Sequence, residues 1–191
     1  MTKLLLVRAV LPLVAGGALL AGCTGTQTGT ASPAPSSSAS TAPTESSSSA
    51  GGGGTQSITD PCSLLELGDL SSYGQFNQPE SKTLGGARTC KYQKKIASAS
   101  DATMVIGVNV RDDASVDQVR DTGGGVVDKP INGRPAKEAP DGAAVGCTLG
   151  LAVGASSRVD VAVLLDRSSN EACQVAEKVA TSAVEPRLPK G

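Results

Sequence analysis

Histidine and tryptophan are absent from this chain of 191 residues, and its aromatic side chains are two tyrosines and one phenylalanine. Histidine is the usual proton shuttle at neutral pH and a frequent metal ligand. Without it, a Ser-His-Asp triad and a Cys-His pair are excluded, and metal sites are disfavoured. We therefore expect no catalytic residues, no metal and no cofactor, and a core built from Val, Leu, Ile and Ala.

The sequence also lacks the common catalytic and phosphate-binding motifs. It contains no Gly-x-Ser-x-Gly elbow, no Ser-x-x-Lys pair and no glycine loop followed by Lys-Ser/Thr. The aspartates at 112, 113, 117 and 121 do not have the spacing of an EF-hand, so we interpret them as a solvated acidic face. With 17 basic and 18 acidic residues, the charge is balanced, and we expect no nucleic-acid partner.

The N-terminus resembles an export signal. A positively charged start precedes an apolar run of about a dozen residues at 9–20, shorter than the roughly 20 residues that span a membrane. The run closes at Leu20-Ala21-Gly22-Cys23, a pattern typical of the lipidation site of bacterial lipoproteins. We expect residues 1–22 to be removed and Cys23 to carry acyl chains that anchor the protein on the extracytoplasmic face of the cell membrane.

Residues 23–57 have the composition of a spacer. They are rich in Ser, Thr, Gly and Pro and contain too little apolar bulk to offset the entropy of ordering, so we expect disorder. A flexible chain of this length spans roughly 30–35 Å. The spacer would hold a globular domain, residues 58–191, near the membrane but clear of it.

The globular region begins with helix signals. Asp60 is placed to cap a helix whose first position is Pro61, and we expect Gly68 to interrupt this helix and Gly74 to end the segment that follows. A longer C-terminal helix is predicted after Ser168, with apolar residues at helical intervals, and Pro186 is expected to close it.

Between these helices, alternating apolar residues predict β-strands. The segments are 88–94, 103–111, 144–153 and 158–165, with a broken extended region at 126–138 that contains the turn signal Asn132-Gly133. The order predicts an α+β fold: an antiparallel sheet on which a short N-terminal and a longer C-terminal helix pack.

Four cysteines remain once Cys23 is set aside: Cys62, Cys90, Cys147 and Cys173. An even number in an exported chain favours two disulfides. Three pairings are possible, and we favour Cys62–Cys90 with Cys147–Cys173, because each bridge then joins a terminal helix to a nearby strand. A redox or zinc site is the alternative, but no Cys-x-x-Cys is present.

The densest group of basic residues, here called the basic cluster, is Arg88, Lys91, Lys94 and Lys95. It is a candidate surface for lipid headgroups, phosphate polymers or an acidic partner. The alternative interpretation is that the charges protect an exposed sheet edge from aggregation.

Several motifs occur in the order seen in a known family. They are the Cys23 motif, the spacer, Asp60-Pro61-Cys62-Ser63-Leu64-Leu65, Cys90-Lys91-Tyr92, Asn132-Gly133-Arg134-Pro135-Ala136 and the Cys173 helix. The chain resembles the actinobacterial lipoproteins grouped as domain-of-unknown-function family 3558. The resemblance implies an envelope lipoprotein and supplies no catalytic residues.

Two functions follow from these observations. The first is a monomeric, non-enzymatic module that binds or scaffolds another envelope protein or lipid through its sheet face or the basic cluster. The second is a carrier of a small ligand or lipid, with an apolar cavity between sheet and helices.

Overall fold

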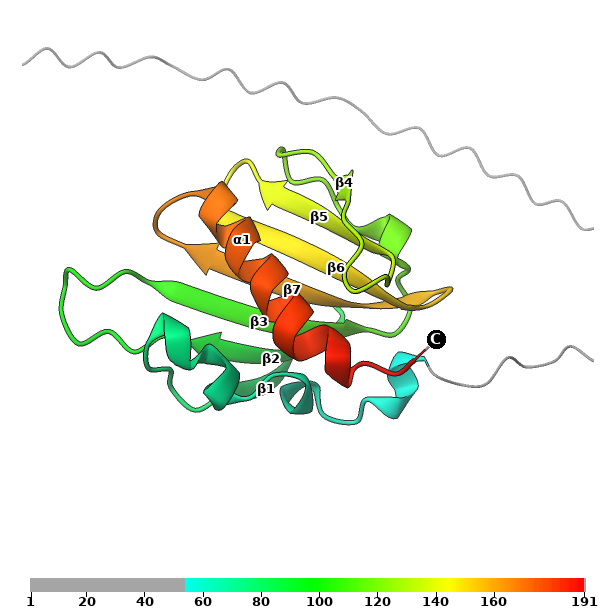
Figure 1. Cartoon of the computed structure of the whole chain (residues 1–191), viewed down its shortest axis with the longest axis horizontal. Helices are drawn as coiled ribbons and strands as arrows, with labels where there is room; N and C mark the ends of the chain where they lie inside the picture. The colour runs from blue at the N-terminus through cyan, green and yellow to red at the C-terminus, as the bar shows by residue number, and fades with distance from the viewer. Residues whose placement is uncertain (1–53, 191) are drawn as a thin grey trace, which may run out of the picture. The chain divides into compact units, whose positions relative to one another are not determined.

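The computed structural model describes residues 54–190; the predicted signal segment, Cys23 and most of the predicted spacer lie outside them. The described strands form a seven-stranded antiparallel sheet in the order β1-β2-β3-β7-β6-β5-β4 (Figure 1). The strands are β1 (Glu80–Leu84), β2 (Ala87–Gln93), β3 (Met104–Arg111), β4 (Val127–Asp128), β5 (Ala136–Asp141), β6 (Gly146–Gly154) and β7 (Ser157–Leu165).

One face of this sheet is covered by the C-terminal helix and two of the N-terminal 3-10 segments. The helix α1 (Ser169–Val179) crosses the sheet, and the 3-10 segments η2 (Pro61–Leu64) and η3 (Leu67–Tyr73) lie beside it (Figure 1). One disulfide, Cys62–Cys90, joins η2 to β2, and the other, Cys147–Cys173, joins β6 to α1. The predicted α+β architecture and both favoured cysteine pairings are confirmed.

The core fills the space between the sheet and the helices. Along the central strands, alternate side chains point toward the side that carries α1, η2 and η3, as the period of two predicts. The strand residues of the core that have no exposed surface are Cys90, Tyr92, Ile106, Val108, Val110, Leu149, Leu151, Val159, Val161 and Val163. From α1, Ala172 and Ala176 meet them with no exposed surface. Small alanines on the helix let it approach the branched side chains of the strands closely.

The N-terminal helix begins as predicted but breaks elsewhere. The Asp60 carboxylate accepts a hydrogen bond from the Cys62 backbone N–H at 2.9 Å, and Pro61 occupies the first position. The break occurs at Leu65, which is extended, whereas Gly68 lies inside η3, so the prediction for Gly68 was wrong. Leu65 leaves the helix because its carbonyl accepts the buried Tyr92 hydroxyl, and Glu66 and Asp69 cap the new segment.

The C-terminal helix also extends past its predicted end. The Ser168 hydroxyl caps α1 by accepting from the Glu171 N–H at 3.2 Å. After Val179 the helix widens into a π segment, η5 (Ala180–Val184), and then tightens into the 3-10 turn η6 (Glu185–Arg187). Pro186 lies at the start of this 3-10 turn, where its missing N–H is tolerated, and the helical segment ends one residue later, at Arg187.

Two hairpins carry strands at the edges of the sheet. Strand β1 was not predicted, because all five of its residues are exposed and show no apolar alternation. The glycines Gly85 and Gly86, both with positive φ, turn it into β2. Between β4 and β5, Asn132 and Gly133 have φ of 50° and 84°, which confirms the predicted turn.

The face of the sheet opposite α1 is only partly covered. After β3 the chain forms the 3-10 turn η4 (Val116–Gln118) over β5 and β6. Gly150 of β6 permits this contact, since a Cβ there would lie 2.5 Å from a methyl group of Val119. At the start of β7, Arg158 and Asp160 are buried on this face, and Arg158 donates to the Ser115 carbonyl beside η4. Over β1, β2, β3 and the end of β7, the described residues form no such cover. We call this uncovered side of the four strands the open face.

The described part begins just before the predicted domain start at Ile58. Thr55–Ser57 form the 3-10 segment η1, and Thr55 is buried. Among the described helices, none is long and apolar enough to cross a lipid bilayer.

Candidate functional site

The basic cluster is not a single surface. Arg88 is held by Asp112 through two hydrogen bonds, at 3.0 and 2.8 Å, and it donates to the backbone carbonyls of Thr55 and Ile58. This hydrogen bonding to Arg88 lowers the pKa of Asp112. Arg88 therefore fastens the start of the described chain to the sheet and is not available to a partner.

The three lysines of the cluster are separated from one another. Lys91 lines the hollow on the open face, and its ammonium donates to Gln93 at 3.1 Å. Lys94 lines a different pocket, beside α1, and Lys95 is exposed. Strand β2 lies between β1 and β3, so these charges do not protect a sheet edge; β1 occupies that position.

The open face contains a hollow of about 430 Å³. Its floor is low because Gly107 of β3 pairs with Ala162 of β7, and neither carries a long side chain. Lys91 faces Gly107 from β2. The lining residues are Lys82, Leu84, Gly85, Thr89, Lys91, Val105, Gly107, Asn109, Arg111, Ala162 and Leu164.

Large apolar side chains are exposed on the open face. Leu84 is 60% and Leu164 is 49% accessible to solvent. They lie at the edge strand β1 and at the central strand β7, on either side of the hollow. An exposed apolar surface around a concave floor is a feature of protein interaction sites.

The charges around this hollow are mostly positive. The buried Asp160 carboxylate is shared by two guanidinium groups, at 2.5 Å from Arg111 and 2.6 Å from Arg158. Arg111 also donates to the Gly85 carbonyl at 3.2 Å, which ties the β1–β2 turn to the sheet. Lys82 pairs with Glu80 at 3.4 Å. Because the single carboxylate of Asp160 pairs with two arginines, and Lys91 adds a further positive charge, the surroundings of the hollow carry an excess of cations.

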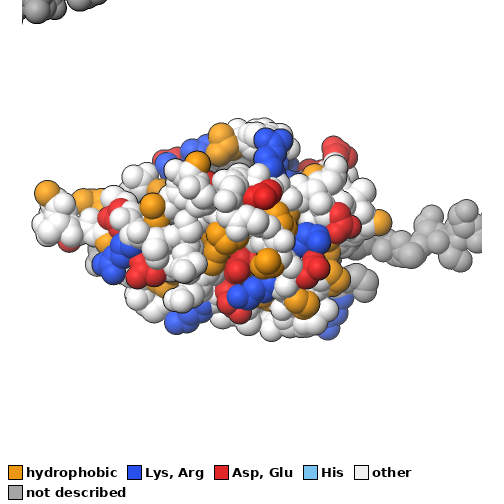
Figure 2. All heavy atoms as spheres, turned by 90° about the horizontal axis from the view of Figure 1, so that it is seen from above, with side chains coloured by type: hydrophobic (Ala, Val, Ile, Leu, Met, Phe, Trp, Pro, Cys, Tyr) orange, Lys and Arg blue, Asp and Glu red, His pale blue; other side chains and the backbone are white. Residues whose placement is uncertain are grey.

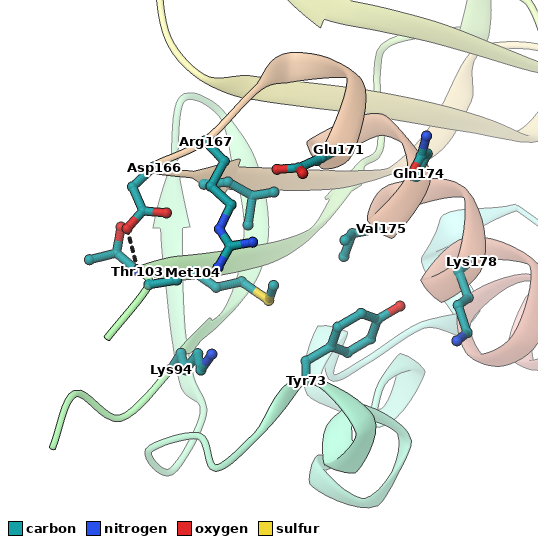
Figure 3. Close-up of a pocket in the computed structure, with 12 residues that line it drawn as sticks. Tyr73, Lys94, Thr103, Met104, Asp166, Arg167, Glu171, Gln174, Val175 and Lys178 are labelled. Atoms are coloured by element: carbon teal, nitrogen blue, oxygen red, sulfur yellow. Dashed lines mark hydrogen bonds between the residues drawn. The ribbon is translucent and has the colours of Figure 1, made fainter. Parts of the chain in front are cut away.

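A second pocket, here called the end pocket, lies where α1 meets the ends of β3 and β7 (Figure 3). Its volume is also about 430 Å³. Apolar surface comes from Tyr73, Met104, Leu165 and Val175, which are half-buried. Polar groups come from Lys94, Thr103, Asp166, Arg167, Glu171, Gln174 and Lys178.

Tyr73 is the unusual member of the end pocket. Its hydroxyl is buried and makes no hydrogen bond within residues 54–190. Burial raises the pKa of this phenol, so the hydroxyl keeps its proton. The Lys178 ammonium lies 5.8 Å from the centre of the Tyr73 ring, within the range of a cation–π contact.

One group of potential metal ligands occurs among residues 54–190. Glu138 lies near the sulfur atoms of Cys147 and Cys173, but these are joined in a disulfide and have no thiolate to bind an ion. Asp117 lies 3.5 Å from the Lys137 ammonium, and the Asp121 carboxylate accepts from two glycine N–H groups of its own loop. On the side shown in Figure 2, acidic and basic side chains are interspersed.

Neither site could be found by inspecting motifs. Each site is built from segments that are distant in the sequence. The edge strand β1, which lines the hollow, is exposed and shows no alternation of apolar and polar residues. One signal was available: Gly107 interrupts the apolar pattern of a central strand, and such a glycine often marks a close approach.

Comparison with curated proteins and with solved structures found no match. A family model described as "Protein of unknown function (DUF3558)" matches residues 18–186. This match includes all of the described strands and α1. It agrees with the resemblance seen in the cysteine and turn motifs. The chain therefore belongs to the DUF3558 family of proteins of unknown function.

Proposed function

We propose that this protein is a lipoprotein, anchored by Cys23 to the extracytoplasmic face of the cell membrane, that binds another envelope protein through the open face. It acts by binding, without catalysis or a cofactor. The observation that carries the proposal is the exposure of Leu84 and Leu164 around a hollow that no helix covers. Burying these side chains against a partner would remove apolar surface from water.

The chemistry of the open face indicates the kind of partner. Lys82 and Lys91 surround apolar side chains, while Arg111 is bound to Asp160. A complementary surface therefore presents an apolar ridge flanked by carboxylates that face the two lysines. The low floor at Gly107 and Ala162 accepts a protruding side chain. We therefore take the occupant to be a protein segment with apolar and acidic residues.

The anchor is supported by the cysteine pairing. Structural disulfides persist in compartments outside the cytoplasm, and the other four cysteines form two bridges. Cys23 is the remaining cysteine, and small residues precede it directly. Intact-mass measurement of membrane-extracted protein is expected to show loss of residues 1–22 and a diacylglyceryl group on Cys23. An unmodified product in the soluble fraction would contradict the anchor.

Binding through the open face is tested by substitution of its exposed leucines. In Leu84→Ser and Leu164→Ser, the complex extracted from membranes is expected to shrink to the size of the free protein. The matched control is Val127→Ser, because Val127 is 53% exposed and lies in β4 at the other edge of the sheet. Folding is checked by thermal unfolding, since exposed positions change stability little. Complexes of unchanged size in both leucine variants would contradict the proposal.

Carriage of a small ligand or lipid is the alternative function. It requires a cavity, and the space between the sheet and α1 is filled by core side chains that are at most 8% exposed. The observation that favours carriage is the end pocket, whose volume of about 430 Å³ lies within the usual range for ligand sites.

A further inference from the structure

We propose that the end pocket binds a small amphiphilic anion, a carboxylate or phosphate group on an apolar stem. The inference deepens the alternative function, carriage of a small ligand, and does not depend on protein binding by the open face. The two sites are lined by different residues, so each can be altered alone.

An apolar stem fits the inner surface of the end pocket. The Met104, Leu165 and Val175 side chains and the Tyr73 ring are half-buried there and open to the pocket. Figure 3 shows Tyr73 facing α1, with Val175 of the helix and Met104 of β3 extending toward it. A flexible thioether beside an aromatic ring adapts to varied apolar shapes. This surface recognises hydrocarbon and gives little preference for one stem over another.

The Tyr73 hydroxyl supplies an unused hydrogen-bond donor. A buried hydroxyl without a partner is unfavourable, because it has lost its water and gained nothing in return. It makes no hydrogen bond among the described residues. A ligand oxygen would accept this hydrogen bond and remove the penalty, and this requires the side chains that cover the hydroxyl to move aside.

The rim of the end pocket has an excess of positive charge. No carboxylate of residues 54–190 lies within 4.0 Å of the cationic groups of Lys94, Arg167 or Lys178, since none of the described ion pairs includes them. Two acidic side chains share the rim. The Asp166 carboxylate accepts a hydrogen bond from the Thr103 backbone N–H at 2.8 Å, and Glu171 lies in the first turn of α1.

These charges set the sign of the ligand. Among the lining residues, three cations and two carboxylates leave one positive charge; Asp101 lies near Lys94 but outside the lining. This excess favours an anion over a neutral or cationic head group. The guanidinium of Arg167 is the group best suited to hold an oxyanion, because its paired N–H donors match two oxygens at once. In Figure 3 it reaches from the loop before α1 into the pocket. The oxyanion head would thus lie at the rim and the stem against Met104 and Val175.

The ligand class is tested with probes of equal stem length. Titration of the purified full chain, below micelle-forming concentrations, is followed by calorimetry and by NMR shifts of residues 165–178. Octanoate and octyl phosphate are expected to bind, and the tighter of the two identifies the head group. Octylammonium, which has the same stem and the opposite charge, is expected to bind at least tenfold more weakly than the anionic probes. Acetate has the carboxylate without the stem and is also expected to bind more weakly than octanoate.

Substitutions then place the binding in the end pocket. Arg167→Gln is expected to weaken octanoate binding about tenfold, the size of a charged hydrogen bond. Arg120→Gln is the control, because Arg120 is also exposed and belongs to neither pocket. Tyr73→Phe is expected to weaken binding several-fold while raising the melting temperature of the free protein, since it removes the unpartnered hydroxyl.

Three results would overturn the inference. They are the absence of binding by both anionic probes, equal binding of octylammonium, and binding that Arg167→Gln and Tyr73→Phe leave unchanged. Loss of partner binding in the open-face variants would not alter any of these readouts, so the two proposals fail separately.

Discussion

Tyr92 connects the sheet to the N-terminal segment. Its side chain is fully buried, and its hydroxyl donates to the Leu65 carbonyl and lies 3.3 Å from the Cys62 carbonyl. Burial, and then the nearby carboxylates of Asp60 and Asp69, raise the pKa of this phenol well above its ordinary value. The folded protein therefore keeps the proton of Tyr92 under conditions that ionise an exposed tyrosine.

This shift predicts a loss of stability in alkali. Above about pH 10 the unfolded chain loses the Tyr92 proton while the folded chain retains it, so the free energy of unfolding falls, by up to about 1.4 kcal/mol per pH unit. Tyr92→Phe is expected to cost about 1–3 kcal/mol at pH 7, because a carbonyl loses its donor, and to show a shallower alkaline decline. Urea unfolding from pH 7 to 11 measures both effects. Parallel pH curves for the two proteins would contradict this account.

The contacts of Arg88 could not be predicted from its neighbours in the sequence. Beside Lys91 and Lys94 it has the pattern of a basic surface, yet its guanidinium is bound to Asp112 and to carbonyls of the η1 region. The partners are 24 to 33 residues away along the chain. No local pattern indicates such a contact, because it depends on which strands become neighbours.

At the scale of elements, each disulfide fastens a helical segment to the sheet. Cys62–Cys90 holds η2 on β2 and Cys147–Cys173 holds α1 on β6, across sequence separations of 28 and 26. The short 3-10 segments have few hydrogen bonds of their own. A covalent link to a core strand keeps them in place in a core that lacks tryptophan.

Removing a bridge is expected to have a predictable cost. The double variant Cys147→Ala/Cys173→Ala is expected to lose about 3–4 kcal/mol of unfolding free energy, the loop entropy for a separation near 26 residues. The matched variant Cys62→Ala/Cys90→Ala removes a bridge that closes a loop of similar length, and it should lose a similar amount of unfolding free energy. Urea denaturation measures both. A loss below about 1 kcal/mol in both variants would show that the bridges add little to stability.

Strands with a buried side could be predicted from the sequence, and the fully exposed strand β1 could not. Strands β3 and β7 alternate because one side faces the core, and the sequence shows it; β1 is wholly exposed and has no pattern to read. Helix starts were also recognisable, since Asp60 and Ser168 act locally as caps. The end of the N-terminal helix was not recognisable, because it depends on a hydrogen bond from the Tyr92 hydroxyl to the Leu65 carbonyl, and Tyr92 is distant in the sequence.

At the scale of the whole described fold, the two sides of the sheet have different roles. One side is covered by α1, η2 and η3 and contains the core. The other is covered over β5, β6 and the start of β7, and the strands beyond this cover carry exposed leucines and cations around a low floor. The candidate sites arise from strand order and register, which place Gly107 beside Ala162. Composition and motifs do not contain this information.

The most direct test of the central claim is position-specific photocrosslinking in intact cells. A photoreactive residue is placed at Leu164 on the open face or, as the control, at Val127 in β4, which has similar exposure. We predict a crosslink to one other protein from position 164 and none from position 127. Gly107→Val, which fills the hollow while leaving an ordinary contact to Asn109, should abolish it. Equal crosslinking from both positions, crosslinking only to a second copy of this chain, or no crosslink at position 164 would contradict the account.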